Sequence, residues 1–534
     1  MQARCAEIPV FKLFKYGTSS FSSVGGLECI APIIQTIPDV PKPTQAQIKG
    51  HIPKWINGSI LQVGAGKFEF GQDKYNSWFD GMALMSKFTV KDGSVTYSSR
   101  FLESDTYKRN KEENRITVSE YGTLASPNSS VQNSEIPLSD NCNTSWVTYK
   151  GDYYVTRENN FMHKVDIDTL ESLGKVNWSE FISGCSASVH PHYEKDGATI
   201  NMVTSCEAEG IRYKIIRIPH GKSHPGDTLE GARVIGSVTP TDRTRINYFH
   251  SFGMTENYII FVEQPLMLNM SPEKALIDSF CLESDKPIVF HVVNKHTGKP
   301  HSMTFYTEPF LCFHHINAFE DQGNIVMDLC CLRDIGYLPI YTLENMRKSG
   351  RALEELYEKT VKAYPRRFVL PLDTQDVDLK PMEYSSAAVR RRDDGQAWCT
   401  PEDLHDDSLT LCGLQFPVIN YSKYNTKKYR YVYGCGYHHL IGDSLIKMDL
   451  KTKRYKVWKD RGFYPSEPVF VPYPDSDRED QGVILSSVVT PHQNLNAFLL
   501  VLDAMDFSEI GRAELPVRMP YSFHARPGQK KETL

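Results

Sequence analysis

The sequence predicts an all-β protein, and three observations favour a β-propeller. Most of the chain consists of short segments in which apolar and polar residues alternate, separated by residues typical of turns. One turn pattern recurs, in which an apolar run ends in Asp or Asn, Thr or Asp follows three residues later, and a second apolar run begins. Segments typical of helices are few. Repetition of one unit over about 350 residues favours a propeller over a β-sandwich.

The strands are expected to pair through tight turns. Lys150-Gly151-Asp152 separates two β-prone runs, which predicts a hairpin over residues 146–156. The recurring turn lies at residues 166–169, 294–297, 449–452 and 503–506. Asp and Asn side chains accept hydrogen bonds from the backbone that follows them, which suits such turns. Because unrelated hairpins share this chemistry, the turns alone fit either repeated blades or independent hairpins.

One clear helix is expected, over residues 343–364. Leu353, Leu356, Tyr357 and Val361 share one face there, and Pro365 ends the pattern. This helix is interpreted as part of a cap, whereas the polar residues 371–410 are expected to form surface loops. No break in composition divides the chain, so residues 41–534 are predicted to form a single domain.

Residues 1–40 are interpreted as an N-terminal extension. The region carries Arg4, Lys12 and Lys15, a Ser-rich stretch, and Glu7 as its single acidic residue before Glu28. This composition favours a mitochondrial presequence and thus a mitochondrial location, with the cytoplasm as the alternative. The 12 Cys form no regular framework, which favours a reducing compartment.

Charge and hydropathy exclude two classes of protein. The formal net charge is -5 and basic residues form no block, which argues against nucleic acid as a partner. No apolar stretch is long enough to span a bilayer, so membrane contact would be peripheral. The sequence gives no indication of the oligomeric state.

Four of the 17 His lie in or beside apolar, aromatic runs: His190, His250, His314 and His524. They are separated by 60, 64 and 210 residues, and blades of about 70 residues would place each on a different blade. Inner strands of a propeller converge on its axis, so the four imidazoles could meet there and bind Fe, Zn, Cu or Ni. Acidic partners would be needed for their ring N–H groups, and Glu158 and Glu467 are candidates.

The sequence resembles the carotenoid cleavage oxygenases from about Pro41 to Ala525. The matching segments are GHIPKWINGS (50–59), KYNSWFDGMA (74–83), HSFGMT (250–255), FHHINAFEDQ (313–322), PRRFVLP (365–371), FYPSEP (463–468) and MPYSFH (519–524). Within the family, the chain is most similar to animal members that cleave the 9′,10′ bond of β-carotene.

The resemblance implies a seven-bladed propeller with a helical cap over the face that carries the site. By motif, the ligands of one Fe(2+) fall on the same four His, while His192 and His315 are expected to pack beside them. Glu158 matches the residue that orients His250, and Glu467 matches the residue that orients His524. The third orienting carboxylate of the family is replaced by Gln415, whose carbonyl can still accept the N–H of His314.

The activity that the resemblance implies is oxidative cleavage of a carotenoid C=C bond by O2, as a dioxygenase. Phe68, Phe101 and Phe416 match substrate-tunnel positions of the family. Cleavage at the 9′,10′ bond of β-carotene or a xanthophyll is expected to give an apo-10′-carotenal and an ionone product. The alternatives are central 15,15′ cleavage to retinal, retinyl-ester isomerisation, and a carotenoid-binding protein with reduced or lost turnover. No Gly-rich signature indicates a flavin or nicotinamide.

Several positions depart from the family pattern. The segment 62–66 contains Ala65 in an otherwise Gly-rich stretch, and Ala525 replaces the Gly that usually follows the last ligand. Residues 126–140 are shorter and more polar than the insert that family members lay on membranes, and the segment after Leu268 is also shortened. These changes are expected to weaken peripheral membrane contact.

Overall fold

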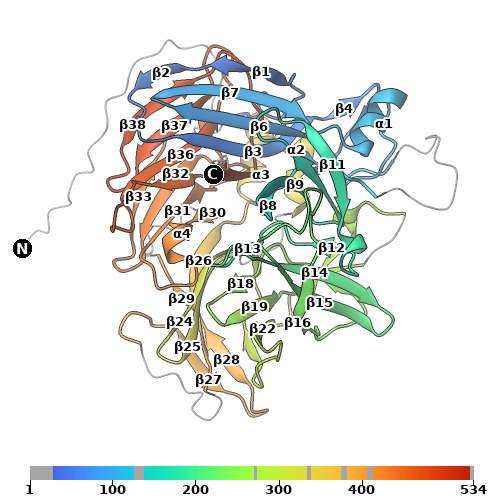
Figure 1. The fold of residues 1–534 in the computed structure, drawn as a ribbon, viewed down its shortest axis with the longest axis vertical. Coiled ribbons are helices and arrows are strands. Elements are labelled where there is room, and N and C mark those ends of the chain that lie inside the picture. The colour runs from blue at the N-terminus through green and yellow to red at the C-terminus, as the bar shows by residue number, and fades with distance from the viewer. Residues whose placement is uncertain are drawn as a thin grey trace, which may run out of the picture.

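The computed structural model describes residues 28–125, 138–269, 273–332, 338–373, 382–405 and 413–528. Over these residues, seven sheets of four to six strands lie in a ring around one axis (Figure 1). The sheets follow in chain order, from the blue sheet at the top of the figure clockwise to the red sheet. The predicted all-β propeller with seven blades is thereby confirmed for the described part of the chain.

The blades are numbered in chain order. Blade 1 contains β1 (Val40–Gln45), β3 (Gly58–Lys67), β6 (Met82–Lys91), β7 (Ser94–Phe101) and β39 (His524–Gly528). Blade 2 contains β8 (Ser145–Tyr149), β9 (Asp152–Thr156), β10 (Phe161–Val165) and β11 (Ser172–Asn177). Blade 3 contains β12 (Ser186–Ala187), β13 (His192–Tyr193), β14 (Thr199–Glu207), β15 (Gly210–Ile218) and β16 (Arg233–Val238).

The next two blades exchange strands at their outer edges. Blade 4 contains β18 (Gly253–Met254), β19 (Tyr258–Glu263), β22 (Ile288–Asn294), β23 (Phe305–Thr307), β27 (Ala388–Arg391) and β28 (Ala397–Thr400). Blade 5 contains β24 (Leu311–Asp321), β25 (Asn324–Leu332), β26 (Ala363–Pro371) and β29 (Glu402–Asp403). After β26 of blade 5, the chain returns to the outer edge of blade 4 as β27 and β28 and then adds β29 to the outer edge of blade 5.

The last two blades and the remaining elements complete the ring. Blade 6 contains β30 (Leu414–Val418), β31 (Tyr431–Gly436), β32 (Ser444–Asp449) and β33 (Arg454–Trp458). Blade 7 contains β2 (Gln47–Gly50), β34 (Tyr464–Pro465), β35 (Val469–Pro472), β36 (Gly482–Val489), β37 (Phe498–Asp503) and β38 (Glu509–Glu514). Two smaller sheets contain β17 (Ile246–Asn247), β20 (Leu266–Leu268), β21 (Phe280–Leu282), β4 (Glu69–Phe70) and β5 (Asp73–Lys74).

The helices are short. They are α1 (Asp105–Glu113), α2 (Leu343–Met346), α3 (Gly350–Tyr357) and α4 (Tyr421–Tyr424), with 3₁₀ turns at Trp78–Asp80, Trp178–Glu180, Leu276–Ser279 and Leu338–Tyr341. Within the described ranges, none of the helices combines the length and the apolar character that a membrane crossing requires.

Both ends of the described chain close the ring. Strand β2, near the start, pairs with β38 of blade 7, and β39, at the end, pairs with β3 of blade 1. Each end is therefore held by the sheet of the other end, which leaves no unpaired gap between the first and last blades. The pairing of Val63 with His524 places His524 on the strand nearest the axis.

The innermost strands are irregular where they pass the axis. In blades 3 and 7 the inner strand is split, between β12 and β13 and between β34 and β35. The register of β24 against β25 shifts around His315, and that of β30 against β31 shifts between Gln415 and Val418. Such bulges and breaks turn a side chain out of the regular alternation. The site described below lies at these interruptions.

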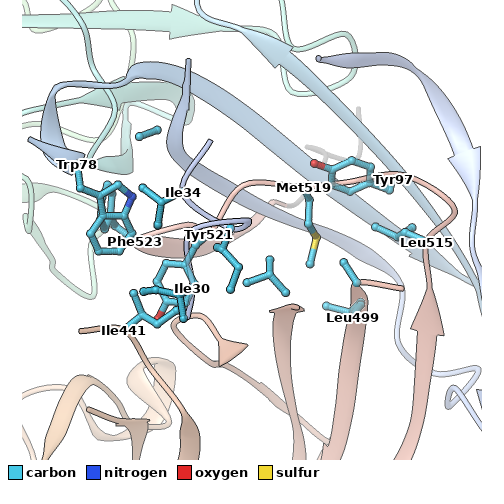
Figure 2. Close-up of a cluster of buried hydrophobic side chains, with 14 of the residues drawn as sticks. Ile30, Ile34, Trp78, Tyr97, Ile441, Leu499, Leu515, Met519, Tyr521 and Phe523 are labelled. Atoms are coloured by element: carbon cyan, nitrogen blue, oxygen red, sulfur yellow. The ribbon is translucent and has the colours of Figure 1, made fainter. Parts of the chain in front are cut away.

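The cap consists of α2 and α3 and packs against the segment that carries Trp78. Leu343, Met346, Leu353 and Leu356 are buried in one apolar cluster, which also contains Trp78 and Phe523. Figure 2 shows Ile30 and Ile34 in the same cluster, so the described part of the predicted extension packs against the propeller. The domain boundary at residue 40 stays a prediction. The Leu343 N–H donates to the Asn76 carbonyl at 2.7 Å, which ties the cap to the segment carrying Trp78.

The predicted turns are confirmed. Lys150 and Gly151 have φ of 51° and 78°, the left-handed values that a two-residue hairpin turn requires. Asp166 Oδ1 accepts from the N–H groups of Asp168 and Thr169 at 2.7 and 3.1 Å. Asn294, Asp449 and Asp503 make the same kind of contact. In all four cases the turn joins the third and fourth strands from the axis, so the recurring pattern reflects a repeated position in the blades.

The single helix predicted over residues 343–364 is wrong. The chain forms two short helices instead: α2 ends at Met346, residues 347–349 follow, and α3 begins at Gly350, which has a left-handed φ of 56°. Residues from Ala363 onward pair with β25 along its whole length, and Pro365 lies inside β26. This pairing outweighs the helical pattern of the last turn. Leu353 and Leu356 are buried, as their shared face predicted.

Two other predictions about loops are affected by the structure. Strands β27 and β28 form a hairpin within residues 371–410, so the expectation of surface loops is wrong there. Residues 1–27, 126–137 and 270–272 lie outside the described residues. The predicted presequence, most of the polar segment 126–140 and the shortening after Leu268 fall in those ranges.

Candidate metal centre

Four histidines from four different blades converge on the axis. His190 comes from the break in blade 3, His250 from the segment that enters blade 4, His314 from β24 and His524 from β39. One ring nitrogen of each lies within 4.8 Å of the others. The Nε2 atoms of His190 and His250 are 2.8 Å apart, and the ring centroids of His190 and His524 are 4.4 Å apart. Such convergence from distant parts of a chain is typical of a metal centre.

The protonation of the cluster suits a cation. Burial, together with repulsion between neighbouring imidazolium charges, holds the pKa values of His190, His314 and His524 well below the usual range. The rings are therefore neutral near pH 7 and present lone pairs. His314 Nε2 is buried without a hydrogen-bond partner, while its Nδ1 is occupied. A metal ion would satisfy this nitrogen, so the residues fit the group that the sequence predicted.

Glu158 orients His250. Its Oε1 contacts His250 Nδ1, and Tyr248 donates its hydroxyl to the same oxygen at 3.1 Å. Burial alone would raise the pKa of this carboxyl, but the contacts from His250 and Tyr248 outweigh burial and lower it. Glu158 therefore stays ionised and fixes the His250 ring with Nε2 directed at the cluster.

Glu467 orients His524. Its Oε1 lies 3.1 Å from His524 Nδ1, and its Oε2 accepts the N–H of Ala525 at 2.6 Å. Burial raises the pKa of this carboxyl to about 8. A divalent cation at the cluster would oppose that effect and favour the carboxylate.

Gln415 occupies the third orienting position. Its Oε1 lies 2.8 Å from His314 Nδ1, so the amide accepts the hydrogen bond that a carboxylate would accept. The Gln415 Nε2 group is buried and has no hydrogen-bond partner in the described structure. The orientation of His314 is thus retained, while one negative charge is missing and one donor is left unsatisfied.

Phe416 is held in a strained conformation beside the cluster. Its φ is 51°, in the left-handed region that phenylalanine rarely adopts. The ring lies 5.0 Å from both His314 and His524, centroid to centroid. The strain accompanies the bulge that turns Gln415 and Phe416 toward the axis on consecutive residues.

His192 and His315 lie next to the cluster but outside it. His315 Nδ1 lies 2.8 Å from Ser251 Oγ, and His192 Nε2 lies 2.9 Å from the Phe252 carbonyl. Burial lowers the pKa values of His192 and His315 to about 4 and about 3. Neither ring belongs to the group of four that lies within ligand distance, in keeping with the packing role that the sequence predicted.

A cavity of about 140 Å³ opens beside the cluster. Its walls are mostly aromatic and include His250, His314, His524, Glu158, Gln415 and Phe416. The residues that the sequence did not predict for this wall are Trp78, Phe79, Tyr121, Asn143, Thr144, Arg157, Tyr248, Phe313, Tyr341, Tyr437 and Phe523. Trp78, Phe79 and Phe523 lie within the segments 74–83 and 519–524 that match the family. That match is the sequence signal by which these cavity residues could have been predicted.

Phe68 and Phe101 are not among the residues that line this cavity. Phe68 is buried in the apolar cluster below the cap, with the Arg347 guanidinium 6.0 Å from its ring centroid. Phe101 stacks on Tyr107 with ring centroids 5.4 Å apart. Of the three predicted tunnel residues, the structure brings Phe416 alone to the cavity.

Arg157 gives the cavity one charged wall. Its Nη1 contacts the carboxylate of Glu120, which also accepts from Ser139. Asp80 holds the neighbouring turn, because it accepts from the Gly122 N–H at 2.7 Å and from the Thr123 hydroxyl at 2.6 Å. The Arg157–Glu120 ion pair compensates two buried charges beside this largely aromatic space.

Comparison with known proteins identifies related sequences over the whole fold. The sequence profile of the family described as "Retinal pigment epithelial membrane protein" (RPE65) matches residues 34–526. The mitochondrial carotenoid-cleaving dioxygenase of Macaca fascicularis is 49% identical over 97% of this chain and 98% of its own length. The human protein of the same name is 48% identical over 97% of this chain and 94% of its own length.

Solved structures share the fold at lower identity. An ACO/RPE65 chimera superposes with a TM-score of 0.75 at 19% identity, over 93% of this chain and 98% of the chimera. Cobalt-substituted Synechocystis ACO superposes with a TM-score of 0.74 at 19% identity and the same coverage. These superpositions support the propeller architecture, in addition to the strand pairing described above.

Proposed function

Because the chain belongs to the RPE65 family of carotenoid oxygenases, we propose that it is a dioxygenase that cleaves the 9′,10′ C=C bond of β-carotene or a xanthophyll with O2. The products are an apo-10′-carotenal and an ionone compound. The observation that carries this proposal is the cluster of four imidazoles beside an aromatic cavity. The names of the relatives, which are carotenoid-cleaving dioxygenases, support the same reaction class.

The metal that we propose is iron, held by His190, His250, His314 and His524. Ferrous iron, when bound, supplies the activation of O2 that the cleavage needs. Imidazole ligands suit iron, and the cobalt-substituted relative indicates that a divalent transition metal fits this fold.

The chain's own residues orient the ligands and exclude water. Glu158, Gln415 and Glu467 each accept the N–H of one histidine and so fix the direction of its lone pair. Phe79, Phe313 and Phe523 form apolar walls of the cavity. A polyene carries no charge that a side chain could bind, so the shape of this aromatic space must position the reactive bond.

Two other functions are alternatives to eccentric cleavage. Central 15,15′ cleavage to retinal would use the same centre with the substrate at another depth. A carotenoid-binding protein with weak turnover is favoured by one observation, the replacement of a carboxylate by Gln415 beside His314. Both alternatives have the same fold and the same cluster, and they differ in the products.

A mitochondrial location is supported by the names of the relatives and by the composition of the first 40 residues. We retain peripheral membrane contact as a proposal because the expected substrate is apolar. Membrane contact would give an apolar substrate a route from lipid to the cavity.

The test is an aerobic incubation of iron-loaded protein with β-carotene and with zeaxanthin, followed by chromatography of the products. We expect loss of polyene absorbance and the appearance of apo-10′-carotenals. If retinal is the sole aldehyde, the enzyme cleaves the central 15,15′ bond and not the 9′,10′ bond. If intact pigment co-elutes with iron-replete protein, the protein binds carotenoids without cleaving them, and the proposed enzymatic function is wrong. The matched control is protein carrying His314→Ala, incubated in the same way.

A further inference from the structure

Two thiols lie in contact at one end of the two innermost strands of blade 3. Cys206 is exposed near the end of β14, and Cys185 is partly buried in the segment that precedes β12. Their Sγ atoms are 3.2 Å apart. Neither the proposed function nor the family comparison uses these residues.

The backbone already holds the two cysteines in a geometry that a bond could join. The Cys185 N–H donates to the Thr204 carbonyl at 2.8 Å, and Ser186 pairs with Thr204 across the strands. Gly184 allows this approach, because a Cβ at that position would lie 2.2 Å from Val203 Cγ1. Lys214 Nζ also donates to the Ser183 carbonyl at 3.1 Å. Both strands are therefore fixed close together before any covalent link forms.

We propose that Cys185 and Cys206 form a reversible disulfide and that hydrogen peroxide is an oxidant that makes it. The exposed Cys206 thiol is the site of attack: its sulfur is oxidised to a sulfenic acid, and one molecule of water leaves. Cys185 then attacks the sulfenic sulfur, the S–S bond forms and a second molecule of water leaves. Two thiols lose two protons and two electrons, and peroxide is reduced to water.

Burial and the neighbouring Cys206 raise the pKa of Cys185 to about 12. Cys185 therefore stays protonated and unreactive toward peroxide in bulk solution, which assigns it the second, resolving step. Contact between the sulfurs compensates for its low thiolate fraction, because the attack occurs within one molecule. An exposed disulfide of this kind is also open to reduction by a small thiol, which restores both cysteines.

The disulfide would act on the segment that leads to the metal centre. The residues after Cys185 run directly to the centre, where the Ser188 hydroxyl donates to the His250 carbonyl at 2.8 Å and accepts the His190 N–H at 3.1 Å. A covalent link at Cys185 fixes the start of this segment to β14. Oxidation therefore stabilises blade 3 at the start of the segment that carries His190.

The test is peptide mapping of the full chain after mild peroxide treatment, with free thiols blocked and without reduction. Trypsin cuts after Lys175, Lys195 and Arg212, so each cysteine lies on its own peptide, 176–195 or 196–212. We expect these two peptides to appear linked, with a mass about 2 Da below their sum, and to separate after dithiothreitol. We also expect the unfolding midpoint to rise by about 3 °C on oxidation.

Variants keep the test independent of folding defects. Cys206→Ser should abolish the linked peptide and the rise in midpoint, whereas the control Cys281→Ser should retain both. The proposal is overturned if wild-type protein, folded and treated in the same way, yields the 196–212 peptide only as free, sulfinic or intermolecularly linked Cys206. Linkage of Cys185 to any other cysteine would overturn it equally.

Discussion

The histidines of the metal centre are oriented by two kinds of group, and the comparison separates geometry from charge. On one side, the carboxylates of Glu158 and Glu467 accept from His250 and His524. On the other side, the amide of Gln415 accepts from His314 at 2.8 Å, a normal hydrogen-bond distance. The direction of a ligand ring is therefore set by an oxygen in the right place, with or without a charge on it.

The two sides differ in how completely their polar groups are satisfied. Glu467 receives a second hydrogen bond from Ala525, and Glu158 receives one from Tyr248. Gln415 carries a buried NH2 group that has no partner among the described residues. An unsatisfied buried donor costs about 1–3 kcal/mol. The amide side is thus the less favourable half of the centre, and a cation bound by the four histidines would have one negative charge fewer on that side.

The largest effect is expected when a ligand is removed from the amide side. His314→Ala should reduce the bound iron to less than about one tenth of one equivalent per chain, because three imidazoles cannot replace the lost bond. Iron content after loading and gel filtration measures this. His224→Ala, at an exposed histidine, is the control and should keep the wild-type iron content. Equal iron content in both variants would exclude His314 as a ligand.

The second prediction makes the carboxylate side resemble the amide side. Glu467→Gln should keep the hydrogen bond to His524 but weaken metal binding by about 10- to 100-fold, because the charge that balances the cation is lost. Competition with a chelator of known affinity measures the change. An unchanged metal affinity would mean that the position of the accepting oxygen matters and its charge does not. The proposed difference between the carboxylate side and the amide side would then be wrong.

The third prediction reverses the exchange. Gln415→Glu should tighten metal binding by about 10-fold, since it restores a charge and removes the unsatisfied NH2 group. The same competition experiment measures it, with the metal-free proteins compared by thermal unfolding. Weaker binding in this variant would show that the centre is adapted to a neutral partner on the His314 side.

The smallest effect is expected from the reinforcement of Glu158. Tyr248→Phe removes one hydrogen bond to the carboxylate and leaves the His250 contact in place. The loss is about 1 kcal/mol, which corresponds to metal binding weaker by about fivefold. A loss as large as that of Glu467→Gln would indicate that the tyrosine hydroxyl, and not the carboxylate alone, orients the ring.

The hairpin turns of the blades could be predicted from the sequence because their signals are local. The turn at Asp166 depends on one side chain and the next three residues, and the hairpin at Lys150 depends on a two-residue turn. The predicted end of the cap helix was wrong because the structure of that segment depends on a contact distant in the chain. Residues from Ala363 onward had a helical pattern, but their pairing with β25, distant in the chain, decides their structure.

The centre itself was predicted in its residues but not in its detail. The spacing of the histidines and the matching segments gave the four imidazoles that the structure brings together. The positive φ of Phe416 follows from a bulge in β30, which no local pattern indicates. Phe68 and Phe101 illustrate the limit of position matching, because burial in an apolar cluster and exposure to a cavity require the same residue type. The contact of Cys185 with Cys206 could not be predicted from the sequence, because it depends on the pairing of β12 with β14.

The central claim is that one iron ion on the four histidines carries out the cleavage. The most direct measurement is an anaerobic titration of Fe(2+) into metal-free protein, followed at each point by exposure to O2 and β-carotene and by quantification of the aldehyde. The account predicts that product formation rises linearly to one equivalent of iron per chain, then stays constant, and that it is absent in His314→Ala. Product formation by iron-free protein, or by His314→Ala at the wild-type rate, would contradict it.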